Sequence, residues 1–372
     1  MRVELTETQR QLRDTIRAFA AERLRPTAAA TDRDGRVPRE LVAELGRLGV
    51  MGCVVPERYG GAGFDHVAYA LAIEELAAAC ASTAAIVTAH ASLATWPILA
   101  FGSDAQRARY LPKLASGEWL GCFASSVEGG LVARRDRDDW VLDGRARFVA
   151  NASEAHVAVA VAAVDPDGVS AFVVETASPG WRVESVAERT GLRGAAPGDV
   201  ALEAVRVPRA NRLGDEAGGA AIAGRTLDAA RIATAATAVG IARACLEDSL
   251  VYARQRRAFG QPLAEFQGLQ WRLADMAAAV EAGRLLTLRA ASLFDRGLPY
   301  SGEASMAKLY AAESAMALAT QAVQMHGGYG YTREFAVERY FRDATVIASA
   351  AGTPEALRLA VADHLLGETA RA

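Results

Sequence analysis

The sequence predicts a mostly helical protein with a central β domain, and three observations carry that prediction. The 372 residues exceed the size at which one hydrophobic core usually stops growing, so more than one domain is expected. Apolar residues recur at helical spacing up to about residue 117, short strand-like segments follow, and helical spacing returns from about residue 224. We therefore expect an N-terminal helical domain over residues 1–118, a β domain over 119–219 and a C-terminal helical bundle over 220–372.

The first domain is expected to consist of helices. Thr6 and Gln9 form a capping-box pattern at the start of an amphipathic surface helix that Pro26 should stop. Residues 38–48 and 103–114 have the pattern of two further helices.

Residues 67–100 are rich in alanine and other apolar residues, which predicts one or two largely buried helices, the second broken by Pro97. His90 lies inside this stretch. A single histidine on such a helix is usually a hydrogen-bonded core residue, so we do not assign it to a substrate site. Residues 59–63 are rich in glycine but lack the spacing of a phosphate-binding motif, and they predict a plain loop.

Between the helical regions, short apolar segments are separated by Asp-Gly, Pro-Asp-Gly and Ser-Pro-Gly turns. Repeated short strands with such turns predict an antiparallel sheet or barrel. The segments begin at Leu120, Trp140, Arg147, Val157, Ser170, Trp181 and Asp199.

The last region has long helical patterns joined by short connections, which predicts an up-down bundle of four helices. The expected helices span residues 227–256, 269–294, 301–326 and 354–366.

Composition excludes several classes of function. The net charge of −3 gives no electrostatic signature of nucleic-acid or anionic-membrane binding. The four cysteines show no CxxC or Cys/His spacing, which fits buried thiols in a reducing cytoplasm and argues against a metal site. The charged N-terminus lacks the apolar core of a signal peptide, and no uninterrupted apolar run of about 18 residues predicts a transmembrane helix. We expect a cytoplasmic protein.

Residues 324–353 are the most informative stretch. Glycine-containing turns at residues 327–330 and 350–353 enclose a charged helical run that ends in Arg342 and Asp343. Upstream, a helix ends in the R-x-x-F-G turn of residues 256–260. These motifs, in this order and within a helix-strand-helix chain, resemble the acyl-CoA dehydrogenase superfamily over essentially the full length. The resemblance implies an FAD-dependent oxidoreductase acting on acyl thioesters.

The resemblance also implies a set of FAD contacts. Arg256 and Phe259 would reach the flavin of a neighbouring subunit, since an arginine fork binds a diphosphate well. Phe148 replaces a tryptophan of the family and Ala150 a threonine, while the motif near residues 121–130 is shortened. The implied cofactor contacts are Phe123, Ser125, Ser126, Phe148, Ala150, Arg256, Phe259, Gln267, Gln324, Gly327, Gly328 and Thr353.

The main departure from the family is at the catalytic base. Most members carry a glutamate where this chain has Ala351, and a minority carry it where this chain has Ala230. A positioned base commonly contributes about 10²–10⁴ in rate. The backbone N–H of Ala351 would still polarise a thioester carbonyl. Asp228 and Arg231 match family positions that contact the thiol carrier or brace the site.

Three functions fit these residues. The first is a dehydrogenase for a small acyl or hydroxyacyl thioester on CoA or acyl carrier protein, as in acyl carrier protein dehydrogenases of polyketide extender-unit pathways. The second is a base-deficient FAD-binding subunit of a hetero-oligomeric dehydrogenase, and the third is a flavin monooxygenase of the same fold. For the first, the resemblance implies a homodimer or homotetramer, with an electron-transfer flavoprotein or oxygen as electron acceptor.

Overall fold

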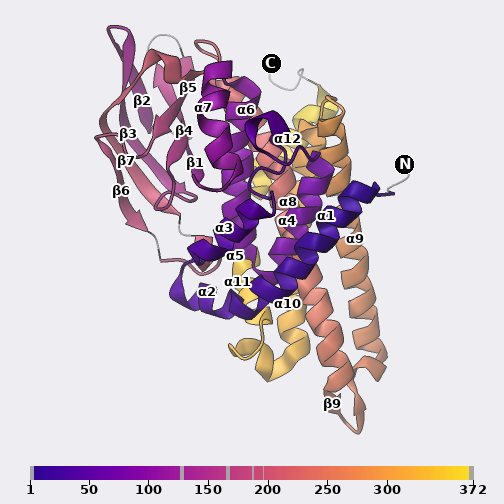
Figure 1. Ribbon diagram of the computed structural model, residues 1–372. Helices are drawn as coiled ribbons and strands as arrows, with labels where there is room; N and C mark the ends of the chain where they lie inside the picture. The colour runs from indigo at the N-terminus through magenta and orange to yellow at the C-terminus, as the bar shows by residue number, and fades with distance from the viewer. Residues whose placement is uncertain (1–3, 126–129, 165–167, 187, 196, 368–372) are drawn as a thin grey trace.

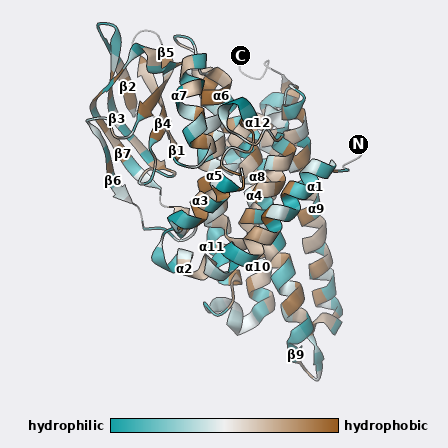
Figure 2. Ribbon diagram, in the orientation of Figure 1, coloured by the Kyte–Doolittle hydropathy of each residue, from teal (hydrophilic) through white to brown (hydrophobic). Residues whose placement is uncertain are grey.

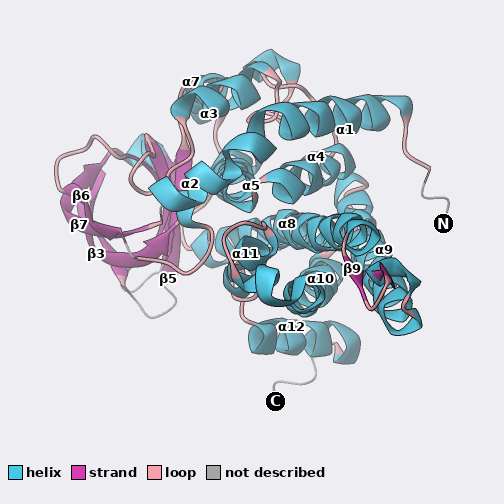
Figure 3. Cartoon of the chain, turned by 90° about the horizontal axis from the view of Figure 1, so that it is seen from below, coloured by secondary structure: helices cyan, strands magenta, loops and turns pink. Residues whose placement is uncertain are grey.

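The structure, a computed structural model, describes residues 4–125, 130–164, 168–186, 188–195 and 197–367. Figure 1 shows a β domain packed against one side of a helical body. Seen from below, the N-terminal helices and the C-terminal helices form two layers of that body, with α12 on the outer side (Figure 3). The predicted fold class, mostly helical with a central β domain, is confirmed.

The N-terminal helices begin with the predicted capping box. Thr6 Oγ1 accepts a hydrogen bond from Gln9 N at 3.2 Å, and Gln9 Oε1 accepts one from Thr6 N at 2.9 Å. These two bonds satisfy backbone donors that a helix start leaves unpaired. The helices are α1 (Glu7–Phe19), α2 (Ala28–Asp34), α3 (Arg39–Arg47), α4 (His66–Ala79), α5 (Ala81–Thr88), α6 (Trp96–Phe101) and α7 (Asp104–Ala115).

Two expectations about prolines are wrong. Pro26 lies in a short 3-10 turn, Arg25–Thr27, and the helical run continues from there into α2. Pro97 lies in the first turn of α6, directly after the π-helical segment Ala89–Thr95, and does not break the run. Proline lacks an N–H and is tolerated where a new helical register begins. The actual break in the apolar stretch is the extended residue Cys80, between α4 and α5.

The β domain is a twisted sheet in the order β6-β7-β3-β2-β4-β5-β8, with β1 paired to β4. Most neighbours are antiparallel as predicted, but β1 and β2 both run parallel to β4, with Gly121 opposite Val157 and Val132 opposite Ala163. Alternation of side chains determines which face a strand buries and not the direction of its neighbour. The strands are β1 (Gly121–Ser125), β2 (Leu131–Asp136), β3 (Asp139–Val149), β4 (Val157–Val164), β5 (Gly168–Glu175), β6 (Trp181–Val186), β7 (Gly198–Val207) and β8 (Arg212–Leu213).

The predicted segments from Trp140 and Arg147 form one strand, β3, and the short strands β2 and β8 were not predicted. The expected C-terminal helices are confirmed, with the charged run between them forming a short helix of its own. They are α8 (Gly219–Gln255), α9 (Gln267–Asp295), α10 (Ser301–His326), α11 (Val337–Ile347) and α12 (Pro354–Leu366). A small hairpin, β9 (Arg257–Ala258) and β10 (Gln261–Pro262), joins α8 to α9.

One hydrophobic core joins the first domain to the bundle, because buried residues of α4, α8, α9 and α10 belong to the same cluster. Figure 2 shows hydrophobic colour on the inner helices α4 and α8, and also on strands of the β domain, which has a core of its own. Two helical stretches, Ala81–Phe101 and Gly219–Gln255, are long and apolar enough to cross a membrane by composition, yet 72% and 83% of their most apolar windows are buried inside the protein. Packing in this core accounts for their apolar character.

His90 and the cysteines behave as predicted. His90 is fully buried, with Nδ1 accepting from Gly121 N at 3.1 Å and Nε2 lying 3.0 Å from Leu114 O. Burial lowers its pKa to about 4, so the ring is neutral. All four cysteines are buried free thiols. Within the described residues, no cluster of His, Cys, Asp or Glu could hold a metal ion.

Candidate flavin and substrate site

A cavity of about 710 Å³ lies where all three regions of the chain meet. Its walls come from α5 and the π-helical segment after it, the end of β3, the loop before β7, α8, and the turn after α11. The structure brings Ala230 and Ala351, the two expected base positions, into this one cavity. None of its lining residues is an aspartate or a glutamate.

Two of the predicted flavin contacts line the same cavity. Phe148 has a left-handed backbone, with φ of 52°, and its ring is 63% exposed. The carboxylate of Asp199 holds this backbone by accepting from Phe148 N at 2.9 Å. Ala150 lies just beyond the end of β3 and also lines the cavity. An exposed aromatic ring held over a cavity is suited to contact a flat ligand such as an isoalloxazine.

The turn that carries Ala351 is anchored through its carbonyl groups. Arg231 Nε donates to Ala351 O at 3.2 Å. Lys308 Nζ donates to Ala348 O at 2.7 Å and to Gly352 O at 2.8 Å. Two cationic side chains therefore occupy the carbonyl side of the turn.

Lys308 is fully buried at this turn. Burial, together with the nearby Arg231 cation, lowers the pKa of its ammonium to about 8. An ammonium is a compact donor with three N–H groups, so one side chain can serve two carbonyls. The turn is thus held by a buried polar contact and not by packing alone.

Asp228 and Arg231 brace the turn from α8 and do not line the cavity. Their side chains form an ion pair, with Arg231 Nη1 at 2.5 Å from Asp228 Oδ1. Ser301 donates a hydrogen bond to the second oxygen of the same carboxylate. The resemblance implied that these two residues either contact the thiol carrier or brace the site. Their contacts favour bracing.

Other predicted contacts lie at the far end of the bundle, near the β9–β10 hairpin (Figure 1). Arg256, Gly327 and Gly328 line a hollow of about 500 Å³. The Arg256 guanidinium lies 5.6 Å from the ring centroid of Tyr329. A side chain added at either glycine would meet no atom within 4 Å, so the surface there is open to a ligand.

Beside this hollow, Phe259 is 96% exposed and lines a groove with Trp271. Gln267 begins α9 and Gln324 is exposed near the end of α10. An open arginine next to unobstructed glycine backbone fits the diphosphate and ADP part of FAD. None of these residues lines the cavity of Ala351.

The remaining predicted contacts lie outside both sites. Phe123 and Ser125 are half-buried in β1, and neither lines the cavity. Ser126 lies outside the described residues. Thr353 is the N-cap of α12, where its Oγ1 accepts from Ala356 N at 3.3 Å.

The loop before β7 is fixed to α11 by the Arg-Asp pair of the sequence motif. Arg342 Nη1 donates to Thr190 O at 2.9 Å, and Asp343 Oδ1 accepts from Leu192 N at 2.6 Å. Between them, Gly191 packs so closely on Arg342 O that an added Cβ would lie 2.0 Å from it. Residues 190–192 are therefore held in place at the wall of the cavity.

Asp343 is 3% exposed, and burial raises its pKa to about 7. Its neighbour Arg342 makes a bidentate ion pair with Asp32, with the shorter contact at 2.7 Å. The motif thus links α11 to both the loop and the N-terminal domain.

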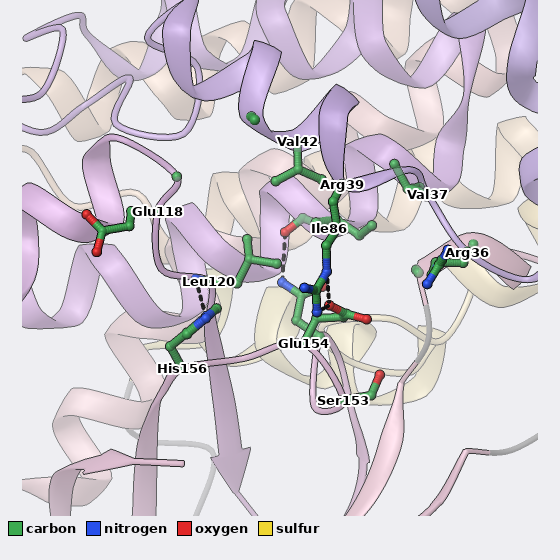
Figure 4. A pocket seen from close by; sticks show the side chains of 15 residues that line it. Arg36, Val37, Arg39, Val42, Ile86, Glu118, Leu120, Ser153, Glu154 and His156 are labelled. Atoms are coloured by element: carbon green, nitrogen blue, oxygen red, sulfur yellow. Dashed lines mark hydrogen bonds and ion pairs between the residues drawn. The ribbon is translucent and has the colours of Figure 1, made fainter. Parts of the chain in front are cut away.

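A second, smaller recess of about 190 Å³ lies between α3 and the β domain (Figure 4). Arg39 reaches across it to Glu154, with a contact of 2.5 Å. His156 Nδ1 accepts from Leu120 N at 3.1 Å, and Asn151 Nδ2 donates to Ile86 O at 3.0 Å. Arg39 and Glu154 thus pair with each other and the other two side chains bond backbone groups, which is typical of an interface between domains.

Three family models match the chain in order. They are the N-terminal domain of acyl-CoA dehydrogenase over residues 6–118, its middle domain over 121–205 and its C-terminal domain over 217–366. The chain is 43% identical to the bovine mitochondrial short-chain specific acyl-CoA dehydrogenase, over 98% of this chain and 91% of the relative.

The chain belongs to the acyl-CoA dehydrogenase superfamily. Among solved structures, butyryl-CoA dehydrogenase from Megasphaera elsdenii is similar with a TM-score of 0.96 and 35% identity, covering 99% of this chain and 100% of that one. The prolyl acyl carrier protein oxidase AnaB is similar with a TM-score of 0.93 and 30% identity, covering 97% and 100%. Members of this superfamily are oxidoreductases that bind FAD, and FAD is the cofactor of this chain.

Two residues of the site were not predicted from the sequence. Lys308 holds the turn of Ala351, and Arg189 lines the cavity. A signal existed for the first: of the 41 basic residues only Lys113 and Lys308 are lysines, so a lysine at the latter position is unusual for this chain. No pattern distinguishes Arg189 from the many other arginines.

Proposed function

We propose that this protein is an FAD-dependent dehydrogenase that oxidises a small acyl or hydroxyacyl thioester, on CoA or acyl carrier protein, without the usual catalytic glutamate. One observation carries the proposal. Ala230 and Ala351 line the same cavity, and that cavity has no carboxylate among its lining residues. A substrate whose oxidation does not begin with removal of an α-proton by a protein carboxylate fits such a cavity best.

The residues around Ala351 favour binding and polarisation of a thioester carbonyl. The N–H groups of Ala348 and Ser349 are bonded within the turn, whereas no described group accepts from Ala351 N, so this N–H is available to a ligand. A fixed backbone N–H aimed at a carbonyl oxygen stabilises the charge that develops there. The side chain of residue 351 is not needed for that contact.

The reaction balances for a hydroxyacyl thioester. Bound FAD would supply the two-electron acceptor for the hydride that leaves the carbinol carbon. The hydroxyl proton leaves to water, and the carbinol becomes a carbonyl. Thr234, Thr237 and Ser349 line the cavity, and their hydroxyl groups, which donate to backbone carbonyls, would accept a hydrogen bond from that water. An electron-transfer flavoprotein or oxygen would receive the electrons.

We also propose which carrier holds the acyl group and in which pathway the enzyme works. The similarity to a protein described as a prolyl acyl carrier protein oxidase supports a carrier-protein substrate. The similarity to short-chain and butyryl-CoA dehydrogenases supports a small acyl group. We propose that the enzyme works in the cytoplasm, on a thioester of a polyketide extender-unit pathway.

The active form would be a homodimer or homotetramer. The cavity contacts, Phe148 and Ala150, and the far-end contacts, Arg256 and Phe259, line different hollows of one chain. A second chain would supply the far-end contacts to each flavin.

A hetero-oligomer is a second candidate, favoured by the same arrangement. With Arg256 and Phe259 open at the far end and no carboxylate in its own cavity, the chain could complete the flavin site of a partner that carries the glutamate. Co-purification with a stoichiometric dehydrogenase partner would support this candidate, whereas turnover by the purified homo-oligomer contradicts it.

The test is anaerobic bleaching of the bound flavin by short acyl and hydroxyacyl thioesters, each on CoA and on a carrier protein. We expect bleaching by a hydroxyacyl thioester and little by the saturated thioester of equal length. If FAD is bound but no thioester bleaches it, the proposed dehydrogenase activity is wrong. Faster bleaching by the saturated thioester would show that another group replaces the glutamate as base.

A further inference from the structure

We propose that Arg189 binds a carboxylate carried by the acyl group, so that the cavity prefers acyl thioesters with a free carboxylate. The inference rests on the proposed function, because it assumes that an acyl thioester enters this cavity. It goes beyond that function by naming the chemical class of the acyl group.

Arg189 is the one charged residue among those that line the cavity. Its guanidinium Nε and Nη1 atoms are buried and have no hydrogen-bond partner among the described residues. Nη2 alone is engaged, by donating to the backbone oxygen of Arg193. No described carboxylate forms an ion pair with Arg189, in contrast to Arg39, which is paired with Glu154 in the smaller recess.

A partly buried cation without a counter-charge is unfavourable. Burial, and repulsion from the neighbouring Arg193, lower the pKa of the Arg189 guanidinium below its ordinary value. Arginine nevertheless keeps its proton in proteins, so the positive charge stays in the cavity. An anionic ligand group would remove the penalty. A carboxylate fits best, because its two oxygens can accept from the second N–H of Nη2 together with either Nε or Nη1.

The position of Arg189 is fixed, as a specificity residue requires. The next residue, Thr190, has its carbonyl bound by Arg342, and Leu192 has its N–H bound by Asp343. Since the loop cannot easily swing away to water, the guanidinium stays at the cavity wall.

We assign the anion that Arg189 would bind to the acyl group and not to the diphosphate of the cofactor. Arg189 shares its cavity with Ala351, whose N–H would bind the thioester carbonyl. The open arginine that suits a diphosphate, Arg256, lines a different hollow. The rest of the cavity wall is apolar or hydroxyl-bearing, so Arg189 is the feature that would select for charge.

The test uses the FAD-bound protein and calorimetry with three matched pairs of thioesters: malonyl-CoA and propionyl-CoA, succinyl-CoA and butyryl-CoA, and glutaryl-CoA and pentanoyl-CoA. We expect the carboxylate-bearing member to bind more tightly in at least one pair, on the order of 10- to 100-fold, as for a charge-assisted bidentate contact. Arg189→Met should abolish this preference and Arg189→Lys should keep part of it. Arg182→Met, which removes an exposed arginine paired with Glu203 on the sheet, is the matched control and should leave the preference intact.

Several results overturn the inference. One is a wild-type protein that shows no preference in any pair, including one that binds none of the six thioesters. Another is an Arg189→Met variant that weakens both members of a pair equally. A third is a variant that loses FAD or shifts the flavin midpoint potential while keeping the preference, because the cation would then serve the flavin. Tight, selective binding without flavin bleaching by any thioester contradicts the proposed function but not this inference.

Discussion

Arg231 donates a hydrogen bond from Nε to the carbonyl oxygen of Ala351 at 3.2 Å, so a cation on α8 fixes the turn that follows α11. The same guanidinium is paired with Asp228. The position at which the superfamily usually keeps its base thus retains its backbone support while lacking the side chain.

Replacing Arg231 by lysine keeps the charge but removes the fork that reaches both Asp228 and Ala351. We expect the rate of flavin reduction by the best thioester to fall on the order of 10²-fold, since small displacements of a site cost rates of this size. Stopped-flow absorbance measures the effect, with FAD content as the control. An unchanged rate would mean that the turn does not need this contact.

Replacing Lys308 by methionine leaves two buried carbonyls, those of Ala348 and Gly352, without their donor. Each unsatisfied buried group costs about 1–3 kcal/mol, so we expect a clear drop in the free energy of unfolding and in Tm. Lys113→Met is the matched control, because Lys113 is the other lysine of the chain and lies partly exposed on α7. If both variants lost a similar free energy of unfolding, the buried Lys308 would not stabilise the protein more than the partly exposed Lys113 does.

Replacing Ala351 by glutamate should create the missing base. Ala351 already has a left-handed backbone, with φ of 55°, so the new residue adds little strain beyond that of alanine. We expect desaturation of a short saturated acyl thioester to rise by about 10²–10⁴. Ala351→Gln has the same size without the charge and should not gain activity. A glutamate variant with no gain in desaturation activity would show that the cavity does not place a thioester α-carbon beside residue 351.

The buried carboxyl of Asp343 predicts a pH dependence of stability. Its pKa is raised by burial from an ordinary 3.8 to about 7, so between these values the folded protein holds a proton that the unfolded chain has lost. The stability contributed by this group is fully present below about pH 3.8 and is lost as the pH rises to about 7.

Asp343→Asn keeps an oxygen that can accept from Leu192 N but cannot titrate in this range. We expect the loss of Tm between pH 4 and pH 7 to be smaller in this variant than in the wild type, on the order of a few degrees. Asp104→Asn, at a side chain that is 94% exposed, should follow the wild-type curve. Identical slopes in all three proteins would show that Asp343 does not titrate there.

Phe259 is 96% exposed in the single chain, and in the proposed oligomer it would contact the flavin of another subunit. Phe259→Ala should therefore lower FAD retention and weaken self-association, while the far-UV circular dichroism stays unchanged. Light scattering and the absorbance ratio of flavin to protein measure the two effects. Leu365→Ala, another exposed apolar position, is the control. Full FAD retention by the Phe259 variant would argue against this contact.

The sequence determined the elements that depend on local pattern. The capping box at Thr6 and the ends of α10 and α12 follow from neighbouring residues, and the structure has them where they were predicted. The prolines were misread for the same reason. Whether Pro26 and Pro97 end a helix depends on where the helical register changes, and that is set by packing against other helices.

The family and the vacancy at Ala230 and Ala351 were readable in the sequence, because motifs and substitutions are local. Only the tertiary structure placed these two residues in one cavity and put Arg256 and Phe259 elsewhere. It also revealed that Lys308 and Arg231 hold the Ala351 turn and that Arg189 lines the cavity without an ion-pair partner among the described residues. Such contacts join residues far apart in the chain. Their charge is visible in the sequence, but whether a charge is buried, paired or free depends on which distant groups the fold brings beside it.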